Sequence, residues 1–323
     1  MDPKAIVDQK NMEGFFQDHI DLFENGKKLF NLKILEHDPL FIMDKSSVLA
    51  EYHVEVENMD GAINKYFLRG SSSPGQKRQR HYQILKNLRK DTFKEEINQV
   101  ADPFGYFSEY NLLIYKNIAG QSLYDKFKHK TRDEWENGIV LALDWLVEFH
   151  EKKPFKIPEM EFQWDEERRR FRVLLDGLLK RFPDHKNILE KTVAKMMVDE
   201  KEILVPESFQ LIHGDFQPHN VIISDFPRRT TVIDFNDSFF YDELYDLSYF
   251  LTQTNQMLTL CNYPDNSSFL NQQGDSYLKK RSIDKSDIVI KKMKLFRLKT
   301  LMHIKSVTEI KIAKLIVNEI EKY

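Results

Sequence analysis

Hydrophobic and polar residues alternate along much of the first third of the chain. Residues 52–57 alternate between apolar and charged side chains, a turn is expected at residues 60–61, and residues 63–69 resume the alternation. Alternation on both sides of a Gly-containing turn is typical of a β-hairpin. Residues 82–88 then carry apolar side chains at helical spacing, and a second strand pair is expected within residues 106–115. The pattern therefore predicts a small antiparallel sheet with one main helix.

The rest of the chain mostly has helical spacing of its apolar residues. An amphipathic packing helix is predicted within residues 1–35. After residue 120, further helical stretches are predicted at residues 134–150, 164–195, 246–260 and 287–322. Residues 209–235 are the exception, because their short apolar runs, cut by polar residues and a turn near Pro227, predict strands. We therefore expect an α+β chain whose second domain is larger and mostly helical.

Length and composition narrow the class of protein. The chain has 323 residues, 41% of them hydrophobic, which suits two domains with separate cores. With 48 Lys and Arg against 51 Asp and Glu, the formal charge of −3 argues against a dedicated nucleic-acid-binding protein. The single cysteine, Cys261, and the absence of a signal-like segment predict a cytoplasmic protein. The best apolar run, residues 138–149, is too short to span a bilayer, so no membrane span is expected.

Three oxygen-bearing side chains are expected to converge near the strands of residues 209–235. Asn220 opens one predicted strand and Asp234 closes the next, so an antiparallel hairpin would bring them together. Asp215, in an HGD tripeptide, lies shortly before Asn220. Carboxylate and amide oxygens suit Mg²⁺, which also takes phosphate oxygens from a substrate. A lone Asp or Asn in a loop often only caps a turn, but HGD-x4-N followed by I-D-F is a long pattern with few accidental matches.

At these residues the sequence resembles the aminoglycoside phosphotransferase and choline kinase family, which is related to the protein kinases. The matching segments are HGDFQPHN at residues 213–220, VIDF at residues 232–235 and DELYDLS at residues 242–248. The resemblance implies that Asp215 is the catalytic aspartate, which accepts the proton of the acceptor hydroxyl, and that Asn220 and Asp234 are Mg²⁺ ligands. It also implies that His213 and Asp246 are structural and hold the loop and the following helix.

The resemblance implies a domain organisation as well. It predicts a two-lobed protein-kinase-like fold with an N-terminal helical extension at residues 1–35, a nucleotide-binding N-lobe at residues 36–115, a hinge at residues 116–120, and a catalytic and acceptor-binding C-lobe at residues 121–323. In this register the hinge backbone at Lys116 and Ile118 faces the adenine.

The N-lobe departs from the family pattern at three places. Arg69 stands where the family has a phosphate-binding Lys, and Arg can also bind phosphate. Lys65 is an alternative phosphate ligand on the same strand face, although the register favours Arg69. His81 stands where the family has a Glu partner for that Lys, so the ion pair is missing. The phosphate-covering hairpin has no glycine, but Ser46 and Ser47 fit the serine-bearing version of some relatives.

Together, these features predict Mg²⁺-dependent transfer of the γ-phosphoryl group of ATP or GTP to a hydroxyl of a small molecule. Sugars, amino alcohols and aminoglycosides are all candidate acceptors. Asp237, Asp242 and Glu243 could line a site for a cationic acceptor or be solvated loop charges. The N-lobe departures favour an alternative, a catalytically weak or inactive nucleotide-binding or scaffold protein with the same fold. A metal-dependent phosphohydrolase is a weaker third hypothesis, because it needs more His and Asp ligands than the sequence groups together.

Overall fold

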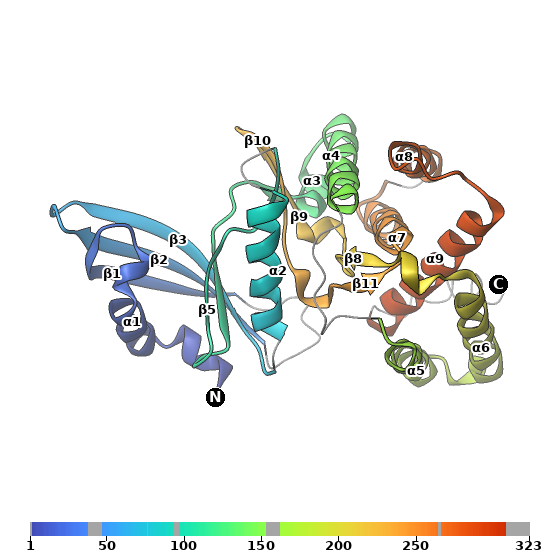
Figure 1. Cartoon of the computed structure of the whole chain (residues 1–323), viewed down its shortest axis with the longest axis horizontal. Coiled ribbons are helices and arrows are strands. Elements are labelled where there is room, and N and C mark those ends of the chain that lie inside the picture. The colour runs from blue at the N-terminus through green and yellow to red at the C-terminus, as the bar shows by residue number, and fades with distance from the viewer. Residues whose placement is uncertain are drawn as a thin grey trace. The chain divides into compact units, whose positions relative to one another are not determined.

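The chain forms two compact units, each built from two segments. The computed structural model describes residues 2–37, 47–75, 77–93, 97–152, 162–263 and 266–307, with side chains as far as residue 304. Unit 1 comprises Met1–Gly120 and Ser224–Asn236, and unit 2 comprises Gln121–Ile223 and Asp237–Tyr323. Unit 1 holds a five-stranded sheet and unit 2 is mostly helical, as expected for the two lobes of a kinase-like fold (Figure 1).

The sheet of unit 1 is antiparallel throughout. Its strand order is β1-β2-β3-β6-β5, and the long strands β1, β2 and β3 run side by side in Figure 1. The β2–β3 pair confirms the predicted hairpin. The strand bounds are β1 Gly26–His37, β2 Val48–Asn58, β3 Ile63–Ser72, β5 Pro103–Phe107 and β6 Leu112–Lys116. Strand β1 was not predicted, because its residues were included in a stretch interpreted as helical.

The core of unit 1 lies on one face of this sheet. Alternate residues of β2, such as Tyr52 and Val54, are buried there with Leu68 of β3. They pack against Met12 and Phe16 of α1 (Gln9–Asp18), so the predicted N-terminal packing helix belongs to the core of unit 1. Since successive strand residues point to opposite faces, Arg69 lies on the face away from this core.

The remaining elements of unit 1 flank the sheet. Helix α2 (Lys77–Asp91) packs against β5 and β6 and is the predicted main helix. Strand β4 (Asn98–Val100) pairs in parallel with β10 (Arg228–Val232), which comes from the second segment of unit 1. Asp234 lies two residues after the end of β10, so this pairing positions the segment that carries Asp234.

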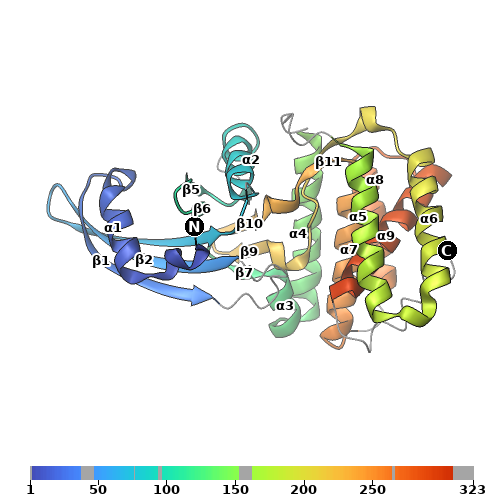
Figure 2. The same cartoon turned by 90° about the horizontal axis from the view of Figure 1, so that it is seen from below.

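Unit 2 consists of helices around two short strand pairs. Strand β8 (Gln210–Ile212) pairs with β11 (Phe239–Tyr241), and β7 (Gln121–Ser122) pairs with the start of β9 (Val221–Asp225). Helices α5, α6, α7 and α9 lie side by side (Figure 2). The helix bounds are α3 Leu123–His129, α4 Arg132–Glu151, α5 Trp164–Arg181, α6 Lys186–Ile203, α7 Leu244–Leu260, α8 Ser267–Lys280 and α9 Asp287–Val307. Short 3₁₀ helices are η1 Pro3–Val7, η2 Ile20–Leu22, η4 Pro183–His185, η5 Pro206–Ser208, η6 Pro218–Asn220 and η7 Phe235–Asp237.

The helical predictions for unit 2 hold with one change. The stretch predicted as one helix over residues 164–195 is two helices, α5 and α6, because Phe182-Pro183 interrupts it. The prediction over residues 287–322 is confirmed as far as Val307, and the remainder lies outside the described residues. In the part of the chain that the structure describes, no helix is long and apolar enough to cross a membrane.

A buried ionic cluster joins the helices of unit 2. The Lys299 ammonium of α9 lies 2.6 Å from Glu167 of α5, 2.7 Å from Glu200 of α6, and 2.8 Å from the hydroxyl of Tyr241. Burial raises the pKa of Glu200 to about 7. Burial alone would lower the pKa of Lys299, but the two carboxylates raise it, so the ammonium stays charged. The cluster therefore ties α5, α6, α9 and β11 together through one lysine.

Candidate functional site

The candidate site of unit 2 is built on the loop that leaves β8. This loop runs from His213 through Gln217 into η6, and β9 follows. Gly214 has φ +81°, and a Cβ at this position would overlap the carbonyl oxygen of Asp237. The glycine of the HGD tripeptide is therefore required by the backbone path and by the closeness of the neighbouring chain.

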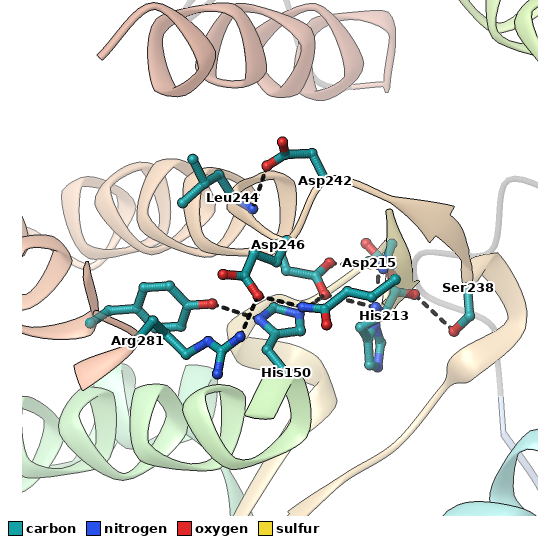
Figure 3. Close-up of polar contacts among 12 residues, drawn as sticks. His150, His213, Asp215, Ser238, Asp242, Leu244, Asp246 and Arg281 are labelled. Carbon is teal, nitrogen blue, oxygen red and sulfur yellow. Dashed lines mark hydrogen bonds and ion pairs between the residues drawn. The ribbon is translucent and has the colours of Figure 1, made fainter. Parts of the chain in front are cut away.

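Asp246, in the first turn of α7, holds this loop from within the unit. Its carboxylate is fully buried and accepts the backbone N–H groups of His213, at 2.7 Å, and Gly214, at 2.9 Å. The ring of His150 lies 3.3 Å from the same carboxylate and 2.6 Å from the Tyr277 hydroxyl (Figure 3). Because hydrogen bonds to a buried charge are strong, Asp246 fixes the backbone directly before Asp215.

His213 completes the turn of the loop. Its carbonyl oxygen accepts a hydrogen bond from the Ser238 hydroxyl at 3.1 Å, and its Nδ1 accepts the backbone N–H of Asp215 at 3.3 Å (Figure 3). The His213 side chain is completely buried. The ring also meets that of Phe216 edge to face, so His213 packs inside the unit and binds the backbone next to Asp215.

The Asp215 carboxylate is surrounded by hydrogen-bond donors. The Gln217 amide donates to Oδ1 at 2.9 Å and to Oδ2 at 2.8 Å, and the Asn220 amide donates to Oδ2 at 3.0 Å. The hydroxyl of Tyr249, on α7, donates to Oδ1 at 2.8 Å. Burial and the charge of Asp215 raise the pKa of Tyr249 well above its usual value, so this phenol remains a donor.

The sequence reasoning missed the roles of Tyr249 and Gln217. Tyr249 was noted only as one of many aromatics in this domain, which core packing explains. Its position three residues after Asp246, on the helix that holds the HGD loop, is a signal that could have identified it, because residues three apart share a helix face. Gln217 lies inside the HGDFQPHN segment, but no role was predicted from its amide side chain.

Asn220 is oriented by Asp215. Its Nδ2 donates to the Asp215 carbonyl oxygen at 2.9 Å as well as to the carboxylate, which turns its Oδ1 away from Asp215. The side chain is 7% exposed, so the amide is held in this orientation. An amide oxygen presented in this way suits a hard divalent cation such as Mg²⁺.

Asp234 lies in unit 1, at the end of β10. Its φ of +65° is in the left-handed region, which is uncommon for a residue other than glycine and is often found at functional sites. The Asn236 amide donates to its Oδ1. The next residue, Phe235, donates its backbone N–H to Nε2 of buried His81 at 3.2 Å. A ring nitrogen that accepts a hydrogen bond belongs to a neutral imidazole, so His81 anchors this backbone instead of carrying a charge.

Arg69 lies on the face of the unit 1 sheet that points away from the core of Tyr52 and Val54, and it pairs with Tyr115 of β6. Its Nε is buried without a hydrogen-bond partner, and no ion pair of Arg69 is present among the described residues. Burial raises the pKa of Tyr115, the charge of Arg69 opposes this shift, and the charge of Asp234 adds to it. Unit 1 therefore brings Arg69 and Asp234 into the neighbourhood of one tyrosine.

Lys65 and Phe67 lie on the same face as Arg69. Lys65 is largely exposed and pairs with Glu55 at 2.8 Å, so its charge is already compensated. Phe67 is 49% exposed and meets the ring of His53 edge to face. The predicted phosphate-covering segment lies partly outside the described residues: Ser46 is not described, and Ser47 is buried directly before β2.

The backbone at Lys116 and Ile118 already has hydrogen-bond partners in unit 1. The N–H of Lys116 donates to the Asp102 carbonyl oxygen at 2.9 Å, and the N–H of Ile118 donates to the Asn117 side chain at 3.0 Å. A cavity of about 470 Å³ is lined by Lys116, Ile118, Arg89, Asp102, Arg229 and Thr231, among others. Lys116 pairs with Leu68 and Tyr115 pairs with Arg69 across the strands, so the Lys116 side chain points to the other face from Arg69.

Of the three acidic residues considered for an acceptor, two are paired within unit 2. Asp242 is buried, lies 2.6 Å from Lys292, and accepts the N–H of Leu244 at the start of α7 (Figure 3). Glu243 pairs with Arg281 at 2.8 Å. Because both charges are neutralised by cations within unit 2, we do not include these two residues in the proposed acceptor site.

Asp237 differs from these two acidic residues. Its backbone carbonyl lies against Gly214, next to Asp215. Burial lowers the pKa of His303, and the charge of Asp237 acts against this shift. Of the three candidates, Asp237 is thus the one whose position is tied to the HGD loop.

In the described part of the chain, no group of three or more His, Cys, Asp or Glu side chains is arranged to hold a metal. A magnesium ion bound by one carboxylate, one amide and the phosphates of a substrate needs no such group.

Comparison with known proteins places the chain in a family. The model of the phosphotransferase enzyme family matches residues 50–278. No curated protein sequence matches the chain. Solved structures share the fold at low identity: a ternary complex of streptomycin, ATP and APH(2")-IIa has 15% identity and a TM-score of 0.55, covering 98% of this chain and 97% of that one.

Two further solved structures have the same fold. The GDP complex of wild-type aminoglycoside 2'-phosphotransferase-IIIa has 16% identity and a TM-score of 0.54, covering 98% of each chain. The ethanolamine kinase of Plasmodium vivax has 14% identity and a TM-score of 0.53, covering 90% of this chain and 80% of that one.

Proposed function

Because the chain belongs to the phosphotransferase enzyme family, we propose that it transfers the γ-phosphoryl group of ATP or GTP, with Mg²⁺, to a hydroxyl of a small molecule. The observation that carries this proposal is the Asp215 carboxylate, which Asn220 and Tyr249 align and which the Asp246-bound loop presents. In this proposal Asp215 accepts the proton of the acceptor hydroxyl as its oxygen attacks phosphorus.

Asn220 and Asp234 are the proposed ligands of Mg²⁺. The orientation of the Asn220 amide, with nitrogen toward Asp215 and oxygen away from it, supports this role. The left-handed backbone conformation of Asp234 supports its role as the second Mg²⁺ ligand, because such conformations are often found at functional sites. Bound Mg²⁺ would neutralise the charge of the nucleotide phosphates, which is the main chemical demand of phosphoryl transfer.

The proposed nucleotide site uses the face of the unit 1 sheet that carries Arg69. Arg69, whose buried Nε has no partner in the described structure, is proposed to bind phosphate. Half-exposed Phe67 on the same face offers an aromatic surface for a purine. Contact of Ser46 and Ser47 with the phosphates stays a prediction. Contact of the backbone of Lys116 and Ile118 with the adenine also stays a prediction.

The acceptor is proposed to be a sugar, an amino alcohol or an aminoglycoside. The solved structures with this fold include a complex with streptomycin and ATP and an ethanolamine kinase, which supports acceptors of these kinds. Asp237, beside Gly214, is the acidic residue that we retain as a contact for a cationic acceptor.

The alternative is a catalytically weak nucleotide-binding or scaffold protein. One observation favours it: His81 replaces the expected Glu and binds the backbone of Phe235, so Arg69 lacks the carboxylate that would orient it.

The proposed function is tested by measuring the change in melting temperature with ATP and with GTP, each with and without Mg²⁺.

A ligand at 100 times its dissociation constant adds about 2.7 kcal/mol to the stability of the folded state, which a thermal scan detects. The proposal expects a Mg²⁺-dependent rise in wild type that is lost in Asp234→Ala. Absence of a rise with either nucleotide would contradict the proposed phosphotransferase, and a scaffold protein with this fold would then be the favoured function.

A further inference from the structure

Three donor groups cover the Asp215 carboxylate. Tyr249 donates to Oδ1 and Asn220 donates to Oδ2. Gln217 Nε2 lies 2.9 Å from Oδ1 and 2.8 Å from Oδ2, so this single amide nitrogen bridges the edge between the two oxygens. An acceptor hydroxyl that approaches this edge to give its proton to Asp215 must therefore displace Gln217.

Burial and anchoring identify the donor that can leave. Tyr249 is 3% exposed and stacks on Tyr245, with ring centroids 5.8 Å apart. Asn220 is 7% exposed and also donates to the Asp215 backbone. Gln217 is partly exposed, and the hydrogen bonds found for its amide nitrogen go to the Asp215 carboxylate. Withdrawal of Gln217 thus frees a position on each oxygen without unpacking the unit.

We propose that Gln217 is a specificity-determining residue whose amide occupies the place of the acceptor hydroxyl on Asp215 until an acceptor displaces it. The inference rests on the proposed function. Tyr249 is its counterpart, a positioning residue that donates to the same Oδ1 and stays in place during the reaction.

Gln217 thereby limits transfer to water. In the productive reaction the acceptor oxygen bonds to the γ-phosphorus, its proton passes to Asp215, and the bond from the γ-phosphorus to the oxygen bridging to the β-phosphorus breaks. Water can follow the same steps and would give a nucleoside diphosphate and inorganic phosphate. A single water molecule has fewer contacts than an acceptor with which to displace an amide held by two hydrogen bonds.

The test compares Gln217→Ala with Tyr249→Phe, since each removes a donor from Oδ1. Release of nucleoside diphosphate from Mg²⁺–ATP and Mg²⁺–GTP is measured without acceptor. We expect Gln217→Ala to raise this hydrolysis about 10-fold above wild type, and Tyr249→Phe to lower it by a similar factor because the carboxylate loses its alignment. A general loss of structure would lower both rates, so the opposite signs distinguish the two roles.

The variants Gln217→Ala/Asp215→Asn and wild type complete the experiment. The double variant should lose the added hydrolysis, and hydrolysis that persists without the Asp215 carboxylate would overturn the inference. Equal or lower hydrolysis in Gln217→Ala, with Mg²⁺–nucleotide binding retained in a melting scan, would also overturn it while leaving the proposed function intact. Failure of every variant and of wild type to bind nucleotide would instead refute the proposed function, and this inference with it.

Discussion

Replacement of Asp246 by Asn tests how the HGD loop is held. The substitution keeps the shape of the side chain but exchanges one carboxylate oxygen for an amide nitrogen. Asp246 accepts two backbone N–H groups, from His213 and Gly214, at a fully buried position. In Asp246→Asn one of these donors faces another donor. Since a hydrogen bond to a charged group contributes about 1.5–3 kcal/mol, we expect a loss of about 2–3 kcal/mol of stability.

The loss is measured by urea unfolding, as a lower midpoint with an unchanged slope. Asp165→Asn is the matched control, because Asp165 also lies in the first turn of a helix but is 93% exposed. An exposed ion pair contributes little, so the control should change stability by less than about 1 kcal/mol. Turnover should also fall in Asp246→Asn, because the loop carries Asp215. If Asp246→Asn is as stable as the control, Asp246 does not anchor the loop.

Two further substitutions test the nucleotide face and the buried cluster. Arg69→Lys should keep Mg²⁺–nucleotide binding and Arg69→Ala should weaken it, since a positive charge near the phosphates is required; isothermal calorimetry decides, and wild-type affinity in Arg69→Ala would rule Arg69 out. Lys299→Met should lower stability by about 3 kcal/mol or more, because it leaves the carboxylates of Glu167 and Glu200 buried without their cation; denaturant unfolding that shows no loss would refute the cluster as described.

Local patterns were sufficient for much of this fold. Alternation of apolar and charged residues predicted the β2–β3 hairpin, and helical spacing predicted α1, α4 and α7. The HGD loop was recognisable from the spacing of HGD-x4-N and I-D-F and from the resemblance to a known family. Alternation, helical spacing and a motif depend on short stretches of sequence, so they can be read from it.

Contacts between distant residues could not be read in the same way. Asp242 and Glu243 were candidates for an acceptor site, but Lys292 and Arg281, which neutralise them, come from 50 and 38 residues further along the chain. His81 contacts the Phe235 backbone 154 residues away. Single-sequence patterns carry no direct information on such pairs. The contact of Tyr249 on α7 with Asp215, 34 residues apart, was also missed, although its helical spacing from Asp246 was a signal.

The proposed function depends on Asp215 acting as the base of a phosphoryl-transfer reaction. The most direct measurement is nucleoside diphosphate release by wild type and Asp215→Asn, with a panel of hydroxyl acceptors and Mg²⁺–ATP or Mg²⁺–GTP, together with nucleotide affinity. We expect Asp215→Asn to lower acceptor-dependent turnover by about 10²-fold or more while nucleotide affinity is nearly unchanged. Equal turnover in wild type and Asp215→Asn would refute Asp215 as the base.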